Sequence, residues 1–312
     1  MRIVVLDDYQ RVAPTYADWA RFDADVAFFD RPVRGAELTD ALAGAEVIVA
    51  MRERTAFPRE LLERLPDLRL LVTTGARNDA IDLDAARRLG VTVCGTEAPG
   101  TSTPELAWGL ILAVLRSIPL EDAGMRTGGW QTTIGGDLAG RRLGIVGLGR
   151  LGERMARIGQ AFGMDVVAWS LNLDPTRAAA LGVTAVTKDE LFSSSDVVTI
   201  HYKLGERSRG LVGAAEIALM TPSAILVNTS RGPIVDTDAL IRALEEGRIR
   251  GAGIDVFDEE PLPADHPLRS APRTVLTPHL GYVTDGTYRV FYPQAVEAIA
   301  AWRSGTPIRV LA

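Results

Sequence analysis

A glycine-rich turn constrains the fold of this chain more than any other feature. Residues 142–152 read R-L-G-I-V-G-L-G-R-L-G, so an apolar run at residues 143–146 ends in a G-x-G-x-x-G motif. The stretch that follows carries apolar residues at helical spacing, namely Leu151, Met155, Ile158 and Phe162. A strand, a glycine turn and a helix in this order form the setting in which the motif binds a dinucleotide. We therefore predict a dinucleotide-binding domain here, with a purely structural turn as the alternative.

The residues of the motif have distinct predicted tasks. The predicted pyrophosphate contacts are Gly147, Leu148, Gly149, Arg150, Leu151 and Gly152. The first glycine allows the tight turn, the second lets backbone approach the pyrophosphate, and the third lets the helix pack on the strand. The helix N-terminus adds unpaired N–H groups and the positive end of the helix dipole.

Bulk composition excludes several classes of function. A chain of 312 residues is long enough for about two domains. Its net charge of −6 argues against nucleic acid or an anionic membrane surface as the partner. Cys94 is the only cysteine, so no internal disulfide is possible. No signal-peptide layout, membrane-length apolar run or metal-binding motif is present, so we expect a cytoplasmic protein without a metal.

Short apolar runs alternate with helical stretches in two blocks. Expected strands of the first block are residues 2–6, 25–29, 46–50, 70–73 and 91–93. Expected strands of the second block are residues 143–146, 166–169, 197–201, 224–228, 251–256 and 274–277. Alternation of this kind predicts parallel sheets covered on both faces, and the second block fits the doubly wound dinucleotide fold.

Three local features lie outside this alternation. Thr103 is expected to cap a helix that begins at Pro104, because threonine and proline suit these positions. Residues 121–139 contain two glycine pairs and are expected to form an irregular arm. Pro293 lies within a helical pattern over residues 284–303 and is expected to kink or restart that helix.

Ligands of open parallel sheets bind beyond the carboxyl ends of the strands. Arg231 directly follows an apolar strand and can pair bidentately with an anion, whereas His279 ends another strand beside a proline. Carboxylates follow a third strand at residues 257–261. Singly, each group has an ordinary structural explanation. Together they supply what a dinucleotide enzyme acting on a carbonyl needs: a cation for a carboxylate, a proton donor, and an acid that favours imidazolium.

Four stretches resemble the D-isomer-specific 2-hydroxyacid dehydrogenases: residues 147–152, 226–236 (L-V-N-T-S-R-G-P-I-V-D), 251–261 (G-A-G-I-D-V-F-D-E-E-P) and 277–281 (T-P-H-L-G). The resemblance extends over nearly the whole chain. It implies two doubly wound parallel-sheet domains. A Rossmann-type cofactor domain, residues 99–281, would be inserted in a flavodoxin-like substrate domain formed by residues 1–98 and 282–312.

The resemblance also implies roles for individual residues. Arg231 would bind the substrate carboxylate and carbonyl, His279 would be the acid/base, and Glu260 would pair with it. Implied cofactor contacts are the 147–152 turn, Ser170, His201, Tyr202, Lys203, Thr229, Ser230, Arg231, Asp255, His279 and Gly281. Implied substrate contacts are Gly75, Ala76, Arg77, Arg231 and His279.

The activity implied by the resemblance is hydride transfer between a nicotinamide cofactor and a D-2-hydroxyacid or 2-oxoacid, as in glyoxylate or hydroxypyruvate reductases. A homodimer is implied through the helix after Pro104 and the arm through Trp130. A non-enzymatic NAD(H)-binding sensor related to corepressors is one alternative. Another is a dehydrogenase for formate or phosphite. Intact Arg231, Glu260 and His279 weigh against the sensor.

Two departures from the family pattern affect specificity. Ser170 stands where relatives carry an acid for the ribose hydroxyls, and no arginine follows to hold a 2′-phosphate, so we expect NAD. NADP is the alternative, because Lys203 adds a cation nearby. Arg77 stands where relatives often have glycine. We hypothesise that Arg77, with Arg52 or Arg54, recognises a second polar or acidic group on the substrate, and a surface arginine is the alternative.

Overall fold

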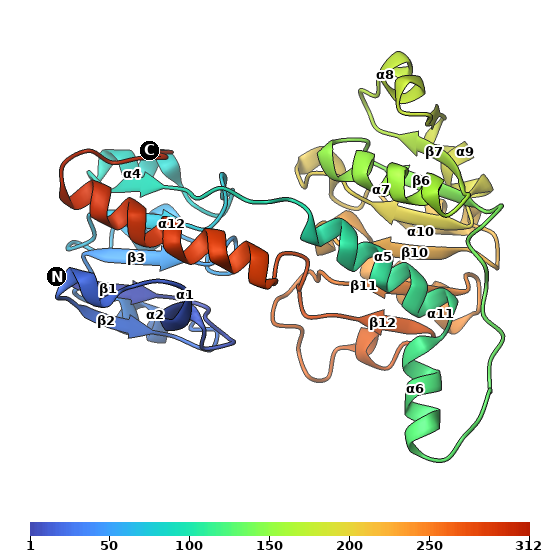
Figure 1. Cartoon of the computed structure of the whole chain (residues 1–312), viewed down its shortest axis with the longest axis horizontal. Coiled ribbons are helices and arrows are strands. Elements are labelled where there is room, and N and C mark those ends of the chain that lie inside the picture. The colour runs from blue at the N-terminus through green and yellow to red at the C-terminus, as the bar shows by residue number, and fades with distance from the viewer. The chain divides into compact units, whose positions relative to one another are not determined.

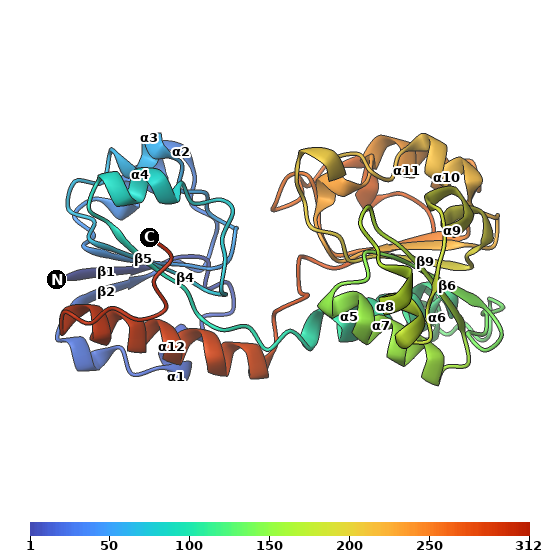
Figure 2. The same cartoon turned by 90° about the horizontal axis from the view of Figure 1, so that it is seen from above.

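The computed structural model describes all residues, 1–312 (Figure 1). The chain divides into two compact units: Met1–Pro99 with Thr284–Ala312 forms unit 1, and Gly100–Val283 forms unit 2. Each unit contains one parallel sheet with helices on both faces (Figure 2). The predicted fold class, two doubly wound α/β domains, is therefore confirmed. No helix combines the length and the apolar character needed to cross a membrane.

The sheet of unit 1 has the strand order β2-β1-β3-β4-β5. Its strands are β1 (Arg2–Val5), β2 (Asp25–Phe28), β3 (Val47–Ala50), β4 (Leu70–Thr73) and β5 (Thr92–Cys94). One face is covered by α2 (Gly35–Leu42), α3 (Arg59–Leu62) and α4 (Leu83–Arg88), and the other by α1 (Ala13–Tyr16) and α12 (Asp285–Arg303) (Figure 2). Strands β3 and β4 are buried along their whole length, as expected of strands covered on both faces.

Helix α12 is continuous through Pro293, which excludes the predicted restart; the other expectation, a kink, stays a prediction. Proline removes one intrahelical hydrogen bond, but Phe291, Tyr292 and Ile299 are almost completely buried. Their packing against unit 1 stabilises the helix across the proline. The helix starts cleanly at Thr284, whose side chain accepts a hydrogen bond from the N–H of Thr287.

The sheet of unit 2 has the strand order β12-β11-β10-β9-β6-β7-β8. Its strands are β6 (Arg142–Val146), β7 (Asp165–Trp169), β8 (Thr184–Ala185), β9 (Val197–Ile200), β10 (Ile225–Asn228), β11 (Gly251–Ile254) and β12 (Thr274–Leu276). From β6 the sheet extends through β7 to β8 on one side, and through β9, β10 and β11 to β12 on the other side. This reversal between β6 and β9 is the topological switch point at which doubly wound sheets bind their ligands. Sequence patterns missed β8, because its two residues form no apolar run.

Helices cover both faces of this sheet as well (Figure 2). On one face lie α5 (Ser102–Leu115), α7 (Arg150–Ala161) and α8 (Pro175–Ala180), and on the other α9 (Lys188–Ser194), α10 (Ala214–Leu219) and α11 (Thr237–Glu245). Short 3-10 turns occur at Ala20–Phe22, Glu206–Ser208, Gly232–Ile234 and Pro267–Arg269. Helix α5 packs so closely on β11 that a Cβ on Gly253 would lie 2.9 Å from Leu110 Cβ.

The arm after α5 is more regular than predicted. Helix α6 (Ile118–Arg126) occupies the first part of the stretch expected to be irregular. An ion pair between Asp122 and Arg126, one helical turn apart at 2.9 Å, supports it. The carboxylate of Glu121 then accepts hydrogen bonds from Thr132 and Thr133, which ties the returning chain to the helix.

Candidate active site

The glycine turn after β6 has the conformation that a phosphate-binding turn requires. Gly147 has a φ of +100°, and a Cβ there would lie 2.5 Å from the carbonyl oxygen of His201. A Cβ on Gly152 would lie 2.2 Å from the carbonyl oxygen of Gly147. Gly149 differs, because no heavy atom lies within 4 Å of its Cβ position, and it directly precedes α7. The turn is thus closely packed on the protein side and open at the glycine that would face a pyrophosphate.

Two polar atoms at neighbouring strand ends make no hydrogen bond although they are buried: Nδ1 of His201 after β9 and Oγ1 of Thr229 after β10. Buried polar atoms without a partner are uncommon and point to a missing ligand or water. Thr229 belongs to the predicted cofactor contacts. The open glycine turn and the unpartnered hydroxyl group therefore fit a bound dinucleotide.

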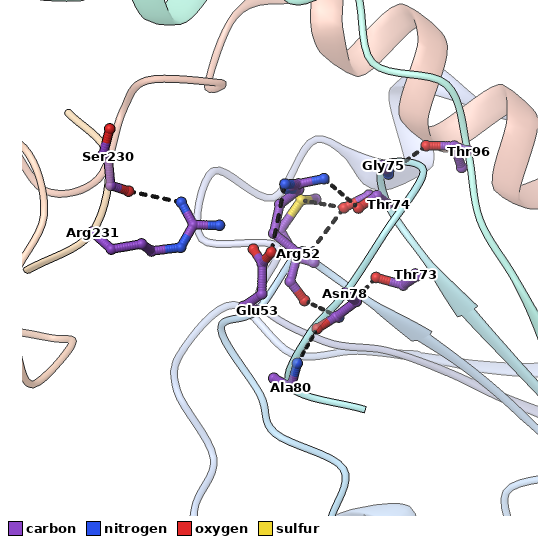
Figure 3. A network of polar contacts seen from close by, with 11 residues as sticks. Arg52, Glu53, Thr73, Thr74, Gly75, Asn78, Ala80, Thr96, Ser230 and Arg231 are labelled. Atoms are coloured by element: carbon purple, nitrogen blue, oxygen red, sulfur yellow. Dashed lines mark hydrogen bonds and ion pairs between the residues drawn. The ribbon is translucent and has the colours of Figure 1, made fainter. Parts of the chain in front are cut away.

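Arg231 is placed by a tightly bonded turn after β10. The side chain of Asn228 accepts a hydrogen bond from Ser230 N at 3.0 Å and donates one to Arg231 O at 2.9 Å. The guanidinium donates from Nη1 to the carbonyl oxygen of Ser230 at 2.7 Å (Figure 3). Next in the chain, Gly232 passes so close to Phe257 that a Cβ would lie 2.1 Å from its carbonyl carbon. The backbone on both sides of Arg231 is therefore held in place.

His279 and Glu260 form a close pair. Nδ1 of His279 lies 2.6 Å from Oε2 of Glu260, and the side chains are 16% and 27% exposed. The other carboxylate oxygen accepts a hydrogen bond from Phe257 N at 3.0 Å, which fixes the carboxylate in place. Because Glu260 contacts Nδ1, Nε2 is the ring nitrogen that can exchange a proton with a substrate.

The turn that carries His279 is wrapped around Asp255, whose side chain is completely buried. The Asp255 carboxylate accepts hydrogen bonds from Thr277 Oγ1 at 2.6 Å, Leu280 N at 2.7 Å and Gly281 N at 2.9 Å. His279 itself has a left-handed φ of +54°, and its N–H donates to the Asp255 carbonyl oxygen at 2.8 Å. Burial raises the pKa of Asp255, while these donors and nearby His279 oppose the rise.

Thr103 also supports this turn, in a way that the sequence did not reveal. It was expected to cap α5, but the residue before the helix is Thr101, whose side chain makes no capping bond. Thr103 Oγ1 instead donates to the carbonyl oxygen of Gly281 at 2.9 Å. The two residues are 178 positions apart in the chain, so no local pattern could indicate the contact.

An aromatic pair lies across the end of β6. Trp169 ends β7 and Tyr202 follows β9, and their rings are stacked with centroids 6.1 Å apart. The Tyr202 hydroxyl group accepts a long hydrogen bond from Leu171 N at 3.4 Å. Tyr202 and Ser170 are predicted cofactor contacts. Trp169 was not predicted to lie beside them, because a strand-end tryptophan carries no specific signal.

Cations on the helices beside β7 are paired with carboxylates. Arg177 on α8 pairs with Glu153 on α7. Lys188 on α9 lies 2.8 Å from Glu216 on α10. Neither group forms a dedicated clamp for a phosphate next to Ser170.

In unit 1 the predicted substrate residues follow β4. Gly75 is buried with a φ of +92°, whereas Ala76 and Arg77 are exposed. Arg52 and Arg54 follow the neighbouring strand β3 and are half-buried. Among the three arginines of the hypothesis, Arg52 is the one whose side chain lies against Gly75 (Figure 3).

The sheet order, the glycine turn at its switch point and the arginine and histidine–glutamate pair at the same edge define a dinucleotide-dependent oxidoreductase. The sequence profile described as "D-isomer specific 2-hydroxyacid dehydrogenase, NAD binding domain" matches residues 108–281. The chain belongs to this family, which confirms the resemblance, and is a 2-hydroxyacid oxidoreductase with a nicotinamide cofactor.

Individual relatives agree with this assignment. A glyoxylate reductase of Aeropyrum pernix is 39% identical over 258 residues, which cover 79% of this chain and 76% of the relative. A D-3-phosphoglycerate dehydrogenase of Methanocaldococcus jannaschii is 37% identical over 253 residues, which cover 80% of this chain and 48% of that relative, so the chain spans about half of it.

Solved structures are similar over nearly the full length. A phosphoglycerate oxidoreductase from Vibrio cholerae has a TM-score of 0.91 at 35% identity, with 98% of this chain and 99% of the other covered. A D-lactate dehydrogenase from Aquifex aeolicus in complex with NAD and lactic acid has a TM-score of 0.81 at 28% identity, with 97% and 96% covered.

The buried His201 gives a pH-dependent prediction. Burial lowers its pKa from 6.5 to about 4, so between these values only the unfolded chain takes up the proton. The free energy of unfolding should therefore fall by about 2 kcal/mol from this residue alone as the pH drops from 7 to 5. In His201→Gln this contribution should vanish, which urea denaturation of both proteins at the two pH values would measure. An equal pH dependence of the free energy of unfolding in the two proteins would contradict the lowered pKa of His201.

Proposed function

We propose that this protein reduces a small 2-oxoacid to the D-2-hydroxyacid, and catalyses the reverse oxidation, with Arg231, Glu260 and His279 as its catalytic residues. The observation that carries the proposal is the 2.6 Å pair of His279 and Glu260 at the sheet edge of the glycine turn. A glyoxylate or hydroxypyruvate reductase is the activity we expect first, by analogy with the glyoxylate reductases among the relatives.

The bound nicotinamide supplies or accepts the hydride at the substrate carbon. The guanidinium of Arg231 would bind the substrate carboxylate and polarise the carbonyl oxygen. His279 would donate its Nε2 proton to that oxygen during reduction and take it back during oxidation. Glu260 would hold Nδ1, which fixes the orientation of the ring and leaves Nε2 to face the substrate.

The remaining contacts belong to the same proposal. On the cofactor side these are the 147–152 turn, Ser170, His201, Tyr202, Lys203, Thr229, Ser230, Asp255 and Gly281. On the substrate side they are Gly75, Ala76 and Arg77 of unit 1. The packed glycine turn and the unpartnered Thr229 hydroxyl group support the cofactor contacts. The lone, buried Cys94 supports a reducing, cytoplasmic location.

Removal of the proton donor tests the catalytic assignment. His279→Ala should lower kcat by about 10²- to 10⁴-fold, the usual contribution of a general acid. NADH binding, measured by quenching of protein fluorescence, should be retained. Glu260→Gln keeps a hydrogen-bonding partner for Nδ1 and should lower kcat by a smaller factor. Near-normal turnover in His279→Ala would exclude the proposed mechanism.

The substrate class is tested by initial rates with glyoxylate, hydroxypyruvate, pyruvate and larger 2-oxoacids, each with NADH and NADPH. Turnover on at least one of them is expected. Tight cofactor binding without turnover on any member would favour the non-enzymatic sensor instead. Oxidation of formate or phosphite, with NAD⁺ or NADP⁺ in place of the reduced cofactor, would favour the other alternative.

We expect NAD(H) to be the cofactor, because Arg177 on α8 and Lys188 on α9 are paired with carboxylates and form no dedicated clamp for a 2′-phosphate. Lys203 is the reason to keep NADP as the alternative. Ser170→Asp would add an acceptor for the ribose hydroxyls and a charge that repels a 2′-phosphate. Such a hydrogen bond is worth about 1.5–3 kcal/mol, so the preference for NADH over NADPH should rise about tenfold or more. Asn172→Asp adds the same charge to an exposed position and serves as the control. A clear preference of the unmodified protein for NADPH would contradict this expectation.

We also expect a homodimer. Large apolar side chains are exposed on α6 and the arm: Ile118, Leu120, Met125, Trp130 and Ile134, the last 92% exposed. Clustered exposure of this kind marks an interaction surface. The arm has a fixed course, because Arg250 donates to the carbonyl oxygens of Leu115 and Ile134.

A charge on this surface should dissociate the dimer. In Ile134→Asp, sedimentation velocity should show a shift from dimer to monomer, because the carboxylate would lose its hydration in the interface. Leu89→Asp, at an exposed leucine of unit 1, is the matched control and should leave the dimer intact. If the unmodified protein is a monomer in solution, the expected homodimer is contradicted.

A further inference from the structure

One residue ties the loop after β3 to the loop after β4 (Figure 3). Arg52 donates its backbone N–H to Thr74 Oγ1 at 2.9 Å and its Nη1 to the Thr74 carbonyl oxygen at 3.2 Å. Its carbonyl oxygen accepts a hydrogen bond from Asn78 Nδ2 at 2.6 Å. The N–H, the carbonyl group and the guanidinium of a single residue thus all bind the neighbouring loop.

Arg52 makes these contacts in a strained conformation. Its φ is +53°, in the left-handed region that residues with a Cβ rarely adopt. The side chain is only 22% exposed and also faces Glu53, with 3.6 Å between Nη2 and a carboxylate oxygen. Strain of this kind persists where the surroundings fix the residue, and it often marks a functional position.

Gly75 is matched to the Arg52 side chain. Besides its positive φ, a Cβ on Gly75 would lie 1.6 Å from Arg52 Nη1, so a side chain there would force the guanidinium to move away. The guanidinium therefore occupies the place that a side chain at position 75 would need. The backbone conformation of Gly75 favours glycine, and the observed position of the Arg52 guanidinium is compatible only with a residue that lacks a Cβ.

Both ends of the 75–77 loop are fixed. Gly75 donates to Thr96 Oγ1 at 2.7 Å and accepts from Thr96 N at 3.0 Å. At the other end, Asn78 is bonded to the carbonyl oxygen of Arg52 and to Thr73 Oγ1 at 2.6 and 2.9 Å. The exposed residues Ala76 and Arg77 lie between these anchors.

We propose that Arg52 is a positioning residue that holds the 75–77 loop in the shape in which it contacts the substrate. The inference rests on the proposed function, because that loop is the predicted substrate contact of unit 1. The proposal differs from the earlier hypothesis for Arg77. The arginine whose guanidinium lies against the loop is Arg52, and it would act on the substrate by holding the loop rather than by direct contact.

The substitution Arg52→Gly tests the contribution of the Arg52 side chain separately from that of its backbone. Glycine adopts the left-handed conformation without strain and keeps both backbone hydrogen bonds, so Tm should stay equal or rise. Without the guanidinium, KM for the preferred 2-oxoacid should rise about tenfold or more, since small misplacements of binding groups are costly. The change in kcat should be smaller, and the NADH dissociation constant should be unchanged. Hydrogen exchange at the amides of residues 74–78 should become faster.

Arg11→Gly is the matched control. Arg11 has a nearly equal φ of +58° and an exposed side chain paired with Asp30. The substitution relieves the same kind of backbone strain without touching the 75–77 loop. It should leave both KM and the exchange rates of residues 74–78 unchanged.

Gly75→Ala tests the pairing from the other side. The new Cβ must displace the guanidinium, so KM should rise as in Arg52→Gly. In the Arg52→Gly background the additional effect of Gly75→Ala should be smaller, because the two residues are in contact. Fully additive effects would overturn the proposed pairing.

The outcomes distinguish this proposal from the proposed function. If Arg52→Gly leaves both KM and exchange at residues 74–78 unchanged, the positioning role is overturned while the activity stands. If the unmodified protein reduces no 2-oxoacid, the proposed function fails, and hydrogen exchange at residues 74–78 alone tests whether Arg52 positions the loop. Faster exchange in Arg52→Gly then supports this role, and unchanged exchange overturns it.

Discussion

The candidate active site depends on one buried carboxylate. Asp255 lies at the end of β11 and accepts three hydrogen bonds from the turn that follows the next strand, β12. That turn carries His279 with a left-handed φ, a conformation that costs roughly 1–2 kcal/mol. Three bonds to a charged acceptor, worth about 1.5–3 kcal/mol each, are enough to hold it. Asp255, a predicted cofactor contact, thus also shapes the turn that carries His279, the candidate acid/base, so the two tasks cannot be changed independently.

Sheet order explains why the catalytic candidates belong together. Strands β10, β11 and β12 are adjacent and parallel, so the turns with Arg231, Asp255 and His279 leave the sheet at the same edge. Neighbouring strands are about 4.8 Å apart, and three strand ends therefore span only about 10 Å. The glycine turn after β6 lies one strand beyond β9 along the same edge. A hydride donor and a proton donor can thereby approach one substrate from unit 2 without any long loop.

Sequence patterns were most informative where the cause of structure is local. The glycine motif and the apolar strands predicted the fold class, because backbone geometry and burial act on consecutive residues. Contacts between distant loops were not predictable: Thr103 supports the His279 turn from 178 positions away, and Arg52 reaches Gly75 from the adjacent strand. Helix α6 was missed because the glycines after it dominated the pattern. The family resemblance supplied the role of Glu260, which its acidic loop alone did not distinguish.

At strand ends in both units, a residue with a functional side chain adopts a left-handed backbone conformation that glycine would adopt without strain. Asp7, Arg52 and His279 each follow a strand of a parallel sheet and have a φ between +53° and +59°. Glycine would relieve the strain at all three positions, yet each residue carries a group with a defined partner. The Asp7 carboxylate accepts bonds from Thr55 and Tyr9, the Arg52 guanidinium bonds Thr74, and the His279 imidazole faces Glu260. Such strain persists because each residue follows a strand that is hydrogen-bonded to its neighbours and cannot shift to release it. The end of a strand is therefore a place where a side chain can be held in an otherwise unfavourable direction.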